Sequence, residues 1–288
     1  MTAINKRFLP ILELNIAVLF ISTSGPLGRY INLPPEHTIL FRAILAAVFI
    51  FLVCKFRKYS LKIDDRRDRA KILLCGLFFG IHWVTYFYAL QLSSVAIGML
   101  SIYTYPVITA FLEPVILKTS FRRSHLLLAL MVLIGIYFLV PEVSFENQHF
   151  IAVLCGITSA FFYALRNIMM KPQVEKYNGS VLMFYQILVI SFMLSPLLFT
   201  ADYELVRNNL GWLAFLALFT TTIGHTLLLL SLRNFAVTTA SILSSVQPVY
   251  GILLGMVFLG EYPPLHTLIG GAMILSAVVI ESSRNLKA

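Results

Sequence analysis

Charged side chains are scarce in this sequence. Asp, Glu, Lys and Arg make up only 12% of the 288 residues, whereas hydrophobic residues make up 59%. A soluble protein of this size could not cover its surface with so few charges, so a soluble globular fold is excluded. The chain is expected to lie in a lipid bilayer.

Motifs that carry enzymatic or metal chemistry are also missing. The sequence has no His-Glu-x-x-His motif, no Gly-x-Ser-x-Gly motif and no pair of aspartates within an apolar stretch. The four aspartates are all expected in loops: Asp64, Asp65, Asp68 and Asp202. The three cysteines lack the paired spacing of redox or zinc sites: Cys54, Cys75 and Cys155. The sequence therefore predicts no enzyme, no metal site and no cofactor.

Long apolar stretches account for most of the chain. A helix needs about 20 residues to cross about 30 Å of hydrocarbon, and ten stretches approach that length. We place them at residues 9–28, 38–54, 70–90, 94–117, 124–140, 150–170, 180–199, 210–232, 238–259 and 266–282. The first lacks the cleavage pattern of a signal peptide and is expected to remain as a helix. The connections are short, so one integrated all-α membrane domain is expected.

Basic residues cluster in alternate connections. With the amino terminus in the cytoplasm, only Arg29 and Arg207 of the 22 lysines and arginines fall in outer connections, and Arg42 and Arg166 lie near span ends. This excess on one side sets orientation, and it explains the net charge of +9 without a nucleic-acid partner. We therefore expect a multi-pass protein of the inner (plasma) membrane with both termini in the cytoplasm.

The second half of the chain repeats the first. Residues 101–107 align with residues 243–249, so that Pro106 matches Pro248, 142 residues later, and Arg29 matches Lys171. Each copy has five spans, an odd number, so equivalent helices must cross the membrane in opposite directions. The sequence therefore predicts two inverted five-helix repeats, residues 1–145 and 146–288, around a central cavity.

Three short motifs resemble those of the drug/metabolite transporter superfamily, specifically its EamA-type ten-helix members. They are Phe41-Arg42-Ala43 in the second span, the Pro-Val pairs at 106–107 and 248–249, and Leu259-Gly260-Glu261 at the end of the ninth span. The first copy departs from the last motif, because Lys118-Thr119 stands where the second copy has Gly260-Glu261. Only one copy is therefore expected to use this glutamate.

The resemblance implies a basket of helices around a central cavity. Helices one, three, four, six, eight and nine would line the cavity, and helices five and ten would lie at the periphery. It also implies transport of small metabolites, which in many bacterial members means export of amino acids or related compounds.

The two matched prolines are candidates for a role in switching. Pro106 and Pro248 each remove a backbone donor within a span and are expected to kink or open the helix. Lipid tolerates a freed carbonyl only beside protein or a watery cavity. The alternative is an ordinary kink without ligand contact.

Hydroxyl and aromatic side chains near these prolines are candidates for substrate binding. Those of the fourth and ninth spans are Ser101, Tyr103, Tyr105, Ser241 and Ser245. Those of the third and sixth spans are His82, Trp83, Tyr86, Phe162 and Tyr163. For any single hydroxyl, helix packing is the alternative role.

Ionisable residues within the spans complete the candidate site. His82 and His225 lie deepest and could contact ligand or carry a proton. Arg166 is the basic candidate, because its helix is expected to line the cavity. Arg42 and Glu113 lie only about 6 Å inside span ends, and an arginine can snorkel that far. A structural role is favoured for both.

The predicted function is a secondary transporter that exports small metabolites, amino acids or related amphipathic compounds, by alternating access. The alternatives are a proton-coupled efflux pump or an importer and, outside transport, a membrane sensor or scaffold. A facilitative carrier or exchanger is the simplest mechanism, since no acidic residue lies clearly at mid-depth. The expected partners are a small-molecule substrate and the bilayer. The oligomeric state is left open, with a monomer as the working assumption.

Overall fold

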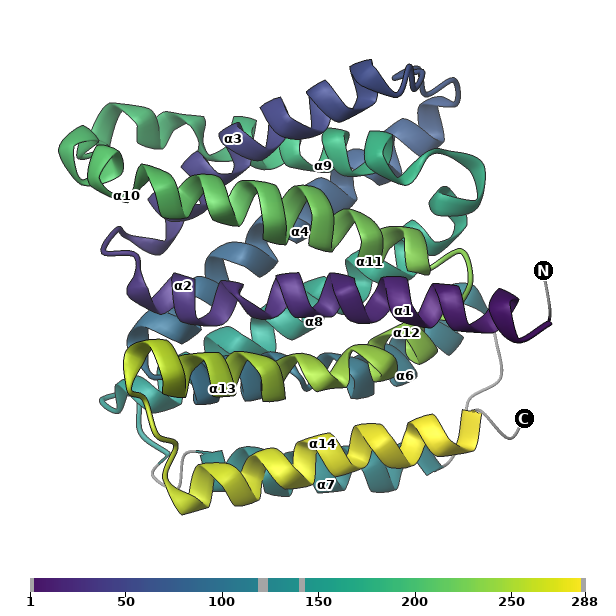
Figure 1. Cartoon of the computed structure of the whole chain (residues 1–288). Helices are drawn as coiled ribbons and strands as arrows, with labels where there is room; N and C mark the ends of the chain where they lie inside the picture. Colours follow the sequence, from purple (N-terminus) through teal and green to yellow (C-terminus); the bar gives the residue numbers. More distant parts are fainter. Residues whose placement is uncertain (1–2, 119–123, 140–142, 286–288) are drawn as a thin grey trace.

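The structure, a computed structural model, describes residues 3–118, 124–139 and 143–285 as a bundle of helices running side by side (Figure 1). The helices of the first half are α1 (Ala3–Ser22), α2 (Ser24–Tyr30), α3 (Pro35–Phe56), α4 (Arg66–Leu92), α5 (Val95–Ile102), α6 (Tyr105–Leu117) and α7 (Ser124–Leu139). The second half begins with α8 (Gln148–Lys176), α9 (Gly179–Leu194), the 3-10 helix η1 (Ser195–Thr200), α10 (Tyr203–Phe215), the π-helix η2 (Leu216–His225) and α11 (Thr226–Ser231). It ends with α12 (Val237–Leu243), the 3-10 helix η3 (Ser244–Val246), α13 (Gln247–Leu259) and α14 (Leu265–Asn285).

These helices form ten spans within the described part of the chain, because several short helices continue one another. Eight stretches are long and apolar enough to cross a membrane. The other two spans, α7 and α14, have shorter apolar parts, Leu126–Leu139 and Leu265–Ala277. The predicted all-helical fold of ten spans is therefore confirmed.

Contacts between the spans follow a pseudo-two-fold pattern. α4 packs on α8, and the equivalent pair, α1 with η2 and α11, packs in the same way. α3 packs on its own equivalent α9, as α7 does on α14. Leu139 lies beside Gly270 and Gly135 beside Ile274, so α7 and α14 run antiparallel. The repeats are therefore inverted, as predicted.

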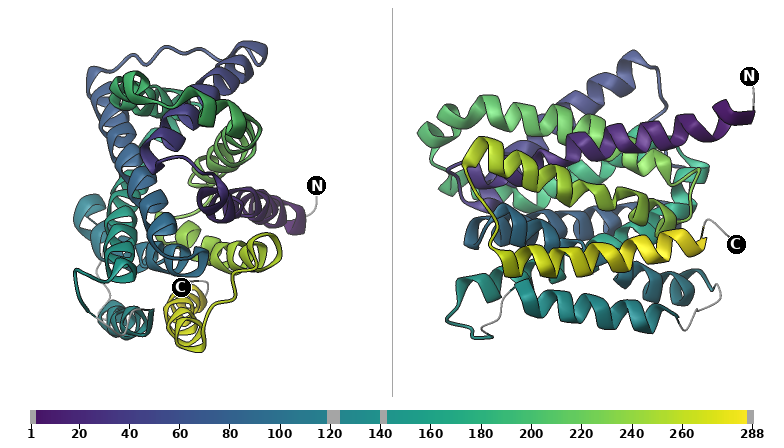
Figure 2. Two further views of the ribbon diagram at one scale, coloured as in Figure 1. Left: turned by 90° about the vertical axis from the view of Figure 1, so that its left-hand side faces the viewer. Right: turned by 60° about the horizontal axis from the view of Figure 1, so that its bottom comes forward.

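The fifth and tenth spans lie at the edge of the molecule. α7 and α14 form a pair below the other helices in Figure 1, and the two further views show the same pair set apart at one side (Figure 2). α1 begins and α14 ends at the same end of the bundle. The peripheral place predicted for these two spans agrees with this arrangement.

The fourth and ninth spans are interrupted at equivalent points. α6 begins at Tyr105 and α13 at Gln247, so each proline stands in the first turn of a new helix, where its missing N–H costs nothing. The preceding residues, Thr104 and Val246, have nearly identical dihedrals, φ −71° and ψ −17° against φ −71° and ψ −16°. The backbone therefore follows the repeat residue by residue.

Equivalent cations cover equivalent helix ends on opposite sides of the bundle. Arg29 Nη1 donates to the carbonyl of Gln91 at 2.8 Å, where α4 ends. Lys171 Nζ donates to the carbonyl of Leu232 at 2.6 Å, where α11 ends. A cation at a helix C-terminus is favoured by the free carbonyls and by the helix dipole. We call these two sides the Arg29 end and the Lys171 end.

A glutamate caps a helix start at each end. At the Arg29 end, Glu261 accepts from the Val95 backbone N–H at 2.9 Å and from Arg29 Nε at 3.0 Å. At the Lys171 end, Glu113 accepts from the Thr238 N–H at 3.1 Å, from the Thr238 hydroxyl, and from the Val237 N–H at 3.3 Å. We call these groups the Arg29-end contact and the Lys171-end contact.

The prediction that only one copy uses such a glutamate is wrong. Val95 and Val237 are equivalent in the repeat, and each begins a helix capped by an acid from the other repeat. The acids come from different sequence positions, which hid the equivalence. Thr119, the residue matched with Glu261, lies outside the described residues.

Asp68 is also placed differently from the prediction, because it lies in a helix and not in a loop. The Asp65 side chain accepts from the Arg67 N–H at 2.6 Å and starts α4 earlier than predicted. Asp68 is only 3% exposed and accepts from Gln173 Nε2 at 3.2 Å and from the Tyr177 hydroxyl at 3.0 Å. It therefore ties the start of α4 to the end of α8.

Candidate functional site

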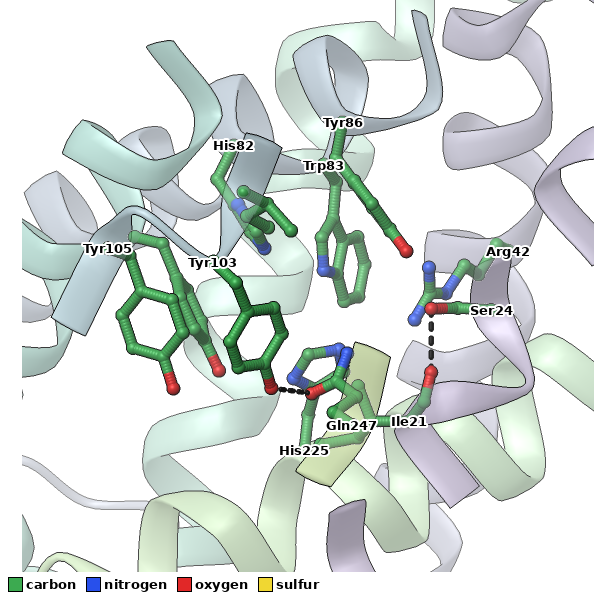
Figure 3. A pocket seen from close by; sticks show the side chains of 12 residues that line it. Ile21, Ser24, Arg42, His82, Trp83, Tyr86, Tyr103, Tyr105, His225 and Gln247 are labelled. Atoms are coloured by element: carbon green, nitrogen blue, oxygen red, sulfur yellow. Dashed lines mark hydrogen bonds between the residues drawn. The ribbon is translucent and has the colours of Figure 1, made fainter. Parts of the chain in front are cut away.

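A small cavity lies at the centre of the bundle, where the interrupted spans meet (Figure 3). Its volume is about 20 Å³, which is room for one water molecule. Every residue that lines it is at most 9% exposed. The lining comes from the first four spans and from the sixth, eighth and ninth. The structure is therefore closed toward both ends.

Seven of the predicted substrate-binding residues line this cavity. They are His82, Trp83, Tyr86, Tyr103, Tyr105, Tyr163 and His225. These side chains come from α4, the α5–α6 break, α8 and η2, so residues far apart in the sequence converge on one space. Their contact with a ligand remains a prediction.

The other five predicted residues lie outside the lining. Ser101 is fully buried and donates to the carbonyl of Gly98 at 3.0 Å, whereas Ser241 donates to that of Val237 at 2.8 Å. Phe162 packs on Phe78 with ring centroids 5.5 Å apart, and Ser245 is half-buried in η3. The fifth, Arg166, is described below. Packing, the alternative considered for the hydroxyls, describes Ser101 and Ser241.

Sequence reasoning missed five of the residues that line the cavity. They are Ile21, Ser24, Arg42, Ile102 and Gln247. Gln247 had a readable signal, because it is the equivalent of Tyr105 in the repeat and both precede a matched proline. Ile21, Ser24 and Ile102 belong to spans expected at the cavity but carry no distinguishing pattern.

The depth of Arg42 in its span suggested that its side chain extends to the membrane surface. The structure shows that it does not. It is 1% exposed, and its Cζ lies 3.9 Å from the centroid of the Trp83 ring. Nε donates to the Thr221 hydroxyl at 2.8 Å and Nη2 to the Thr220 hydroxyl at 3.4 Å. The guanidinium therefore turns toward the interior of the bundle, because the threonine hydroxyls and the Trp83 ring bind it there.

The π-helix η2 supplies these threonine partners. The hydroxyls of Thr220 and Thr221 both donate to the carbonyl of Leu216, and that of Thr222 donates to Ala217 at 2.8 Å. These bonds satisfy carbonyls in the wider turn. A π turn also holds more residues than an α turn. His225, one residue out of register with His82 in the repeat, nevertheless faces the same cavity.

Arg166 is as deeply buried as Arg42 but is satisfied by neutral neighbours. Nε donates to Gln186 Oε1 at 2.7 Å, and Nη1 donates to Asn167 Oδ1 at 2.9 Å. Its Cζ lies 4.3 Å from the centroid of the Phe79 ring. The structure thus places Arg166 between α8 and α9, outside the cavity lining.

One side of the cavity is an aromatic wall. His82 stacks on Tyr163 with ring centroids 4.3 Å apart, and Tyr105 meets Tyr163 edge-on at 5.0 Å. His82 Nδ1 lies 2.7 Å from the Ser159 hydroxyl. The Tyr103 hydroxyl lies 2.8 Å from Gln247 Oε1, to which it can donate. The Tyr105 hydroxyl donates to the carbonyl of Ser241 at 3.2 Å, so this wall consists of flat rings with several of their polar atoms hydrogen-bonded.

The opposite side contains unsatisfied polar atoms. Trp83 Nε1, the Tyr86 hydroxyl and His225 Nδ1 are buried and have no hydrogen-bond partner among the described residues. None of the described residues that line the cavity is Asp or Glu, and the described residues contain no cluster of His, Cys, Asp or Glu fit for a metal ion. Buried polar atoms without partners are rare and call for an explanation. The cavity is rich in donors and carries one cation.

Comparison with known proteins gives consistent matches. The model of the EamA-like transporter family matches residues 9–140 and again residues 150–282. An uncharacterized transporter of Helicobacter pylori is 23% identical over 252 residues, which cover 84% of this chain and 83% of that protein. The pseudopaline exporter CntI of Pseudomonas aeruginosa is 22% identical over 249 residues, covering 86% of each chain.

A solved crystal structure has the same fold. It aligns with a TM-score of 0.72 at 18% sequence identity and covers 97% of this chain and 99% of the other. At this identity the likeness concerns the fold alone.

Proposed function

The chain belongs to the EamA-like transporter family, and we propose that it exports small polar or amphipathic metabolites, amino acids or related compounds, by alternating access. That it is a multi-pass membrane transporter follows from the family. The substrate class and the outward direction are our proposal. A relative that is named an exporter, pseudopaline exporter CntI, supports the direction.

The observation that carries the mechanism is a central cavity between inverted repeats, closed at each end by an equivalent contact. Glu261 caps the start of α5 at the Arg29 end, and Glu113 caps the start of α12 at the Lys171 end. Because the repeats are nearly equivalent, opening one end or the other should give states of similar energy. Release of one contact at a time would expose the cavity to one side.

We assign the units and the orientation on the same basis. Residues 1–145 and 146–288 are proposed to rock against each other, with Pro106 and Pro248 allowing the two interrupted spans to hinge. The termini and the Lys171 end are placed in the cytoplasm, because the basic residues concentrate in the corresponding connections. The Arg29 end then faces outward.

Facilitated export or exchange is the first choice of coupling, because no acidic residue is found among the described residues that line the cavity. A proton-coupled pump is the second candidate. It is favoured by His225, whose Nδ1 faces the cavity without a partner.

The test combines cells and vesicles. Metabolites released by cells that make the protein are compared with those released by cells that do not, and each difference is tested for flux in vesicles with purified protein. We expect an amino acid or related compound to leave the cells, and its flux to persist when an ionophore removes the pH gradient. Accumulation inside the cells would reject export, and loss of flux with the gradient would establish the proton-coupled candidate. No flux of any compound would indicate a sensor or scaffold.

A further inference from the structure

We propose that Arg42 binds the carboxylate of the transported metabolite, so that the cavity selects small amphipathic carboxylates over neutral and purely cationic compounds. The inference rests on the proposed function, because it assumes that the metabolite enters the central cavity. It adds the chemical class of the substrate and the residue that recognises it.

The first observation is a buried charge without a counter-ion. Arg42 is 1% exposed, and no described acidic side chain forms a salt bridge with it. Its described hydrogen-bond partners are two neutral hydroxyls, those of Thr220 and Thr221. A buried, unpaired charge is costly, and an ionisable group within the membrane marks a functional site by default. A ligand with a negative charge would remove the cost.

The second observation is that the guanidinium keeps free donors on the side of the cavity. A guanidinium has five N–H donors, and Arg42 uses Nε and Nη2, while Nη1 donates to no described residue. Arg42 lines the cavity and points into it (Figure 3). Arg166 supplies the contrast: it is equally buried, but Gln186, Asn167 and Met183 accept from all three of its nitrogens. Burial alone therefore does not define the site.

The third observation is that other unsatisfied atoms face the same space. Trp83 Nε1 and the Tyr86 hydroxyl are donors, His225 Nδ1 can donate in the appropriate tautomer, and none has a partner among the described residues. A carboxylate accepts several hydrogen bonds through its two oxygens, and bonds to a charged group are stronger than neutral ones. A carboxylate therefore fits these donors and can replace the threonine hydroxyls on Arg42.

The aromatic wall defines the rest of the ligand. Tyr103 and Tyr105 present rings across from Arg42 (Figure 3), and Tyr163, which also lines the cavity, packs edge-on against Tyr105. Rings of this kind favour a flat or apolar group. In the closed state the volume of about 20 Å³ holds only a water, so the ligand enters when one end opens.

The chain offers its own reporter for the test. It has two tryptophans: Trp83 lines the cavity beneath Arg42, whereas Trp212 is 44% exposed. Trp212→Phe leaves Trp83 as the only indole. Its emission in purified protein is titrated with 3-phenylpropionate, 3-phenylpropionamide and 3-phenylpropylamine, with sodium chloride held constant. We expect the carboxylate to bind about tenfold or more tightly than the amide, and the amine to bind most weakly.

Variants identify the residue responsible. Arg42→Gln should bring the ratio of carboxylate to amide affinity close to one while amide binding persists, which also shows that the variant is folded. Arg42→Lys should keep part of the preference, because it keeps the charge but loses the planar fork. Arg207→Gln removes an exposed arginine of α10 and should leave the ratio unchanged.

Equal binding of the carboxylate and the amide by the starting protein would overturn the proposal, as would no carboxylate-dependent change at millimolar concentration. A preference that survives Arg42→Gln would overturn it as well. If Arg42→Gln does not fold, Arg42→Lys replaces it, and an unchanged ratio at unchanged affinity in that variant would overturn the proposal that the guanidinium of Arg42 binds the carboxylate. A preference without flux in vesicles would reject the proposed function and leave the site. Flux in vesicles without a preference for the carboxylate would support the proposed function and reject the role of Arg42.

Discussion

Lys118 has a backbone conformation that its equivalent in the other repeat, Gly260, adopts without strain. Both follow the last helical residue of their span, with φ 57° and ψ 40° at Lys118 and φ 66° and ψ 20° at Gly260. A side chain in this left-handed region costs about 1 kcal/mol relative to glycine. The replacement of glycine by Lys118 in the first repeat therefore destabilises the backbone locally.

Lys118→Gly is expected to raise the free energy of unfolding by up to about 1 kcal/mol. The shift is measured as the midpoint of thermal unfolding of the purified protein in detergent. Lys55→Gly is the matched control, because Lys55 is an exposed helical lysine of α3, where glycine should cost about 1 kcal/mol. Destabilisation by both substitutions would show that the conformation at Lys118 carries no strain.

The two arginines show how far single residues could be interpreted from sequence. Depth along a span placed Arg42 and Arg166 alike, since each lies near a span end. Their partners separate them: Arg166 meets amide oxygens, whereas Arg42 meets threonine hydroxyls and the Trp83 ring. Apart from Asn167, which follows Arg166 in α8, those partners come from other helices, so no pattern within one span could separate the two arginines.

Close packing of α8 on α5 depends on a glycine. A Cβ added at Gly156 would lie 1.8 Å from Ser101 Oγ and 2.5 Å from Ser101 Cβ. Small residues allow this approach of helices in membranes. Ser101, predicted as a cavity residue, is thus held in a helix interface.

Gly156→Ala is expected to lower the free energy of unfolding by about 1–3 kcal/mol, the usual cost of overpacking. Ser101→Gly removes both clashing atoms and should restore much of the loss in the double variant, as measured by thermal unfolding. Gly211→Ala on α10 is the control, because an added Cβ there meets nothing within 4 Å. It should be neutral or stabilising by up to about 1 kcal/mol. Additive effects of the two substitutions at 101 and 156 would contradict the packing explanation.

The Lys171-end contact makes a prediction about a single element, α12. Glu113→Ala removes the acceptor of the Val237 and Thr238 N–H groups and should cost about 1 kcal/mol at the start of this helix. In protein whose native cysteines are replaced by alanine, Ser241→Cys on α12 should then react faster with a polar thiol reagent. Glu261→Ala, the equivalent change at the Arg29 end, should leave this rate unchanged. Equal rates in the two variants would contradict the assignment of Glu113 as the group that holds the start of α12.

The positions of the helices were predicted well where the length of an apolar stretch determines them. They were predicted poorly where hydrogen bonds between side chains and backbone determine them. Each span lies within several residues of its predicted position, because the length of an apolar stretch can be determined directly from the sequence. The π-helix η2 and the cap that starts α4 at Asp65 depend on side-chain bonds to the backbone. These side-chain bonds compete with the regular backbone hydrogen bonds of an α-helix, and contacts with neighbouring helices decide which set forms.

At the scale of the whole molecule, the repeat is more complete in space than in sequence. The alignment identified the matched prolines and predicted the inverted halves. It did not reveal that Glu113 and Glu261 cap equivalent helices, because these acids occupy different positions in their repeats. The capping of the equivalent helix starts is thus the same at the two ends, although the glutamates that provide it occupy different sequence positions.

Alternating access requires that only one of these end contacts opens at a time. In cysteine-free protein, pairs of cysteines at positions 29 and 261 and at positions 113 and 238 can be joined by a cleavable bis-thiol reagent, since these side chains touch. Joining either pair should abolish flux in vesicles, and cleavage should restore it. The reason is that a carrier locked at one end reaches only one of its two open states.

The same locked proteins should differ in access to the cavity. With positions 29 and 261 joined, a polar reagent should reach the cavity only from the Lys171 end, and with positions 113 and 238 joined, only from the Arg29 end. A pair at positions 36 and 88 is the control, because Tyr88 donates to Glu36 at 2.7 Å within one repeat. These residues move together if the repeats are the rocking units, so joining them should leave flux intact. Flux that persists with either end locked would mean that solute moves without opening both ends, and the carrier mechanism would have to be abandoned.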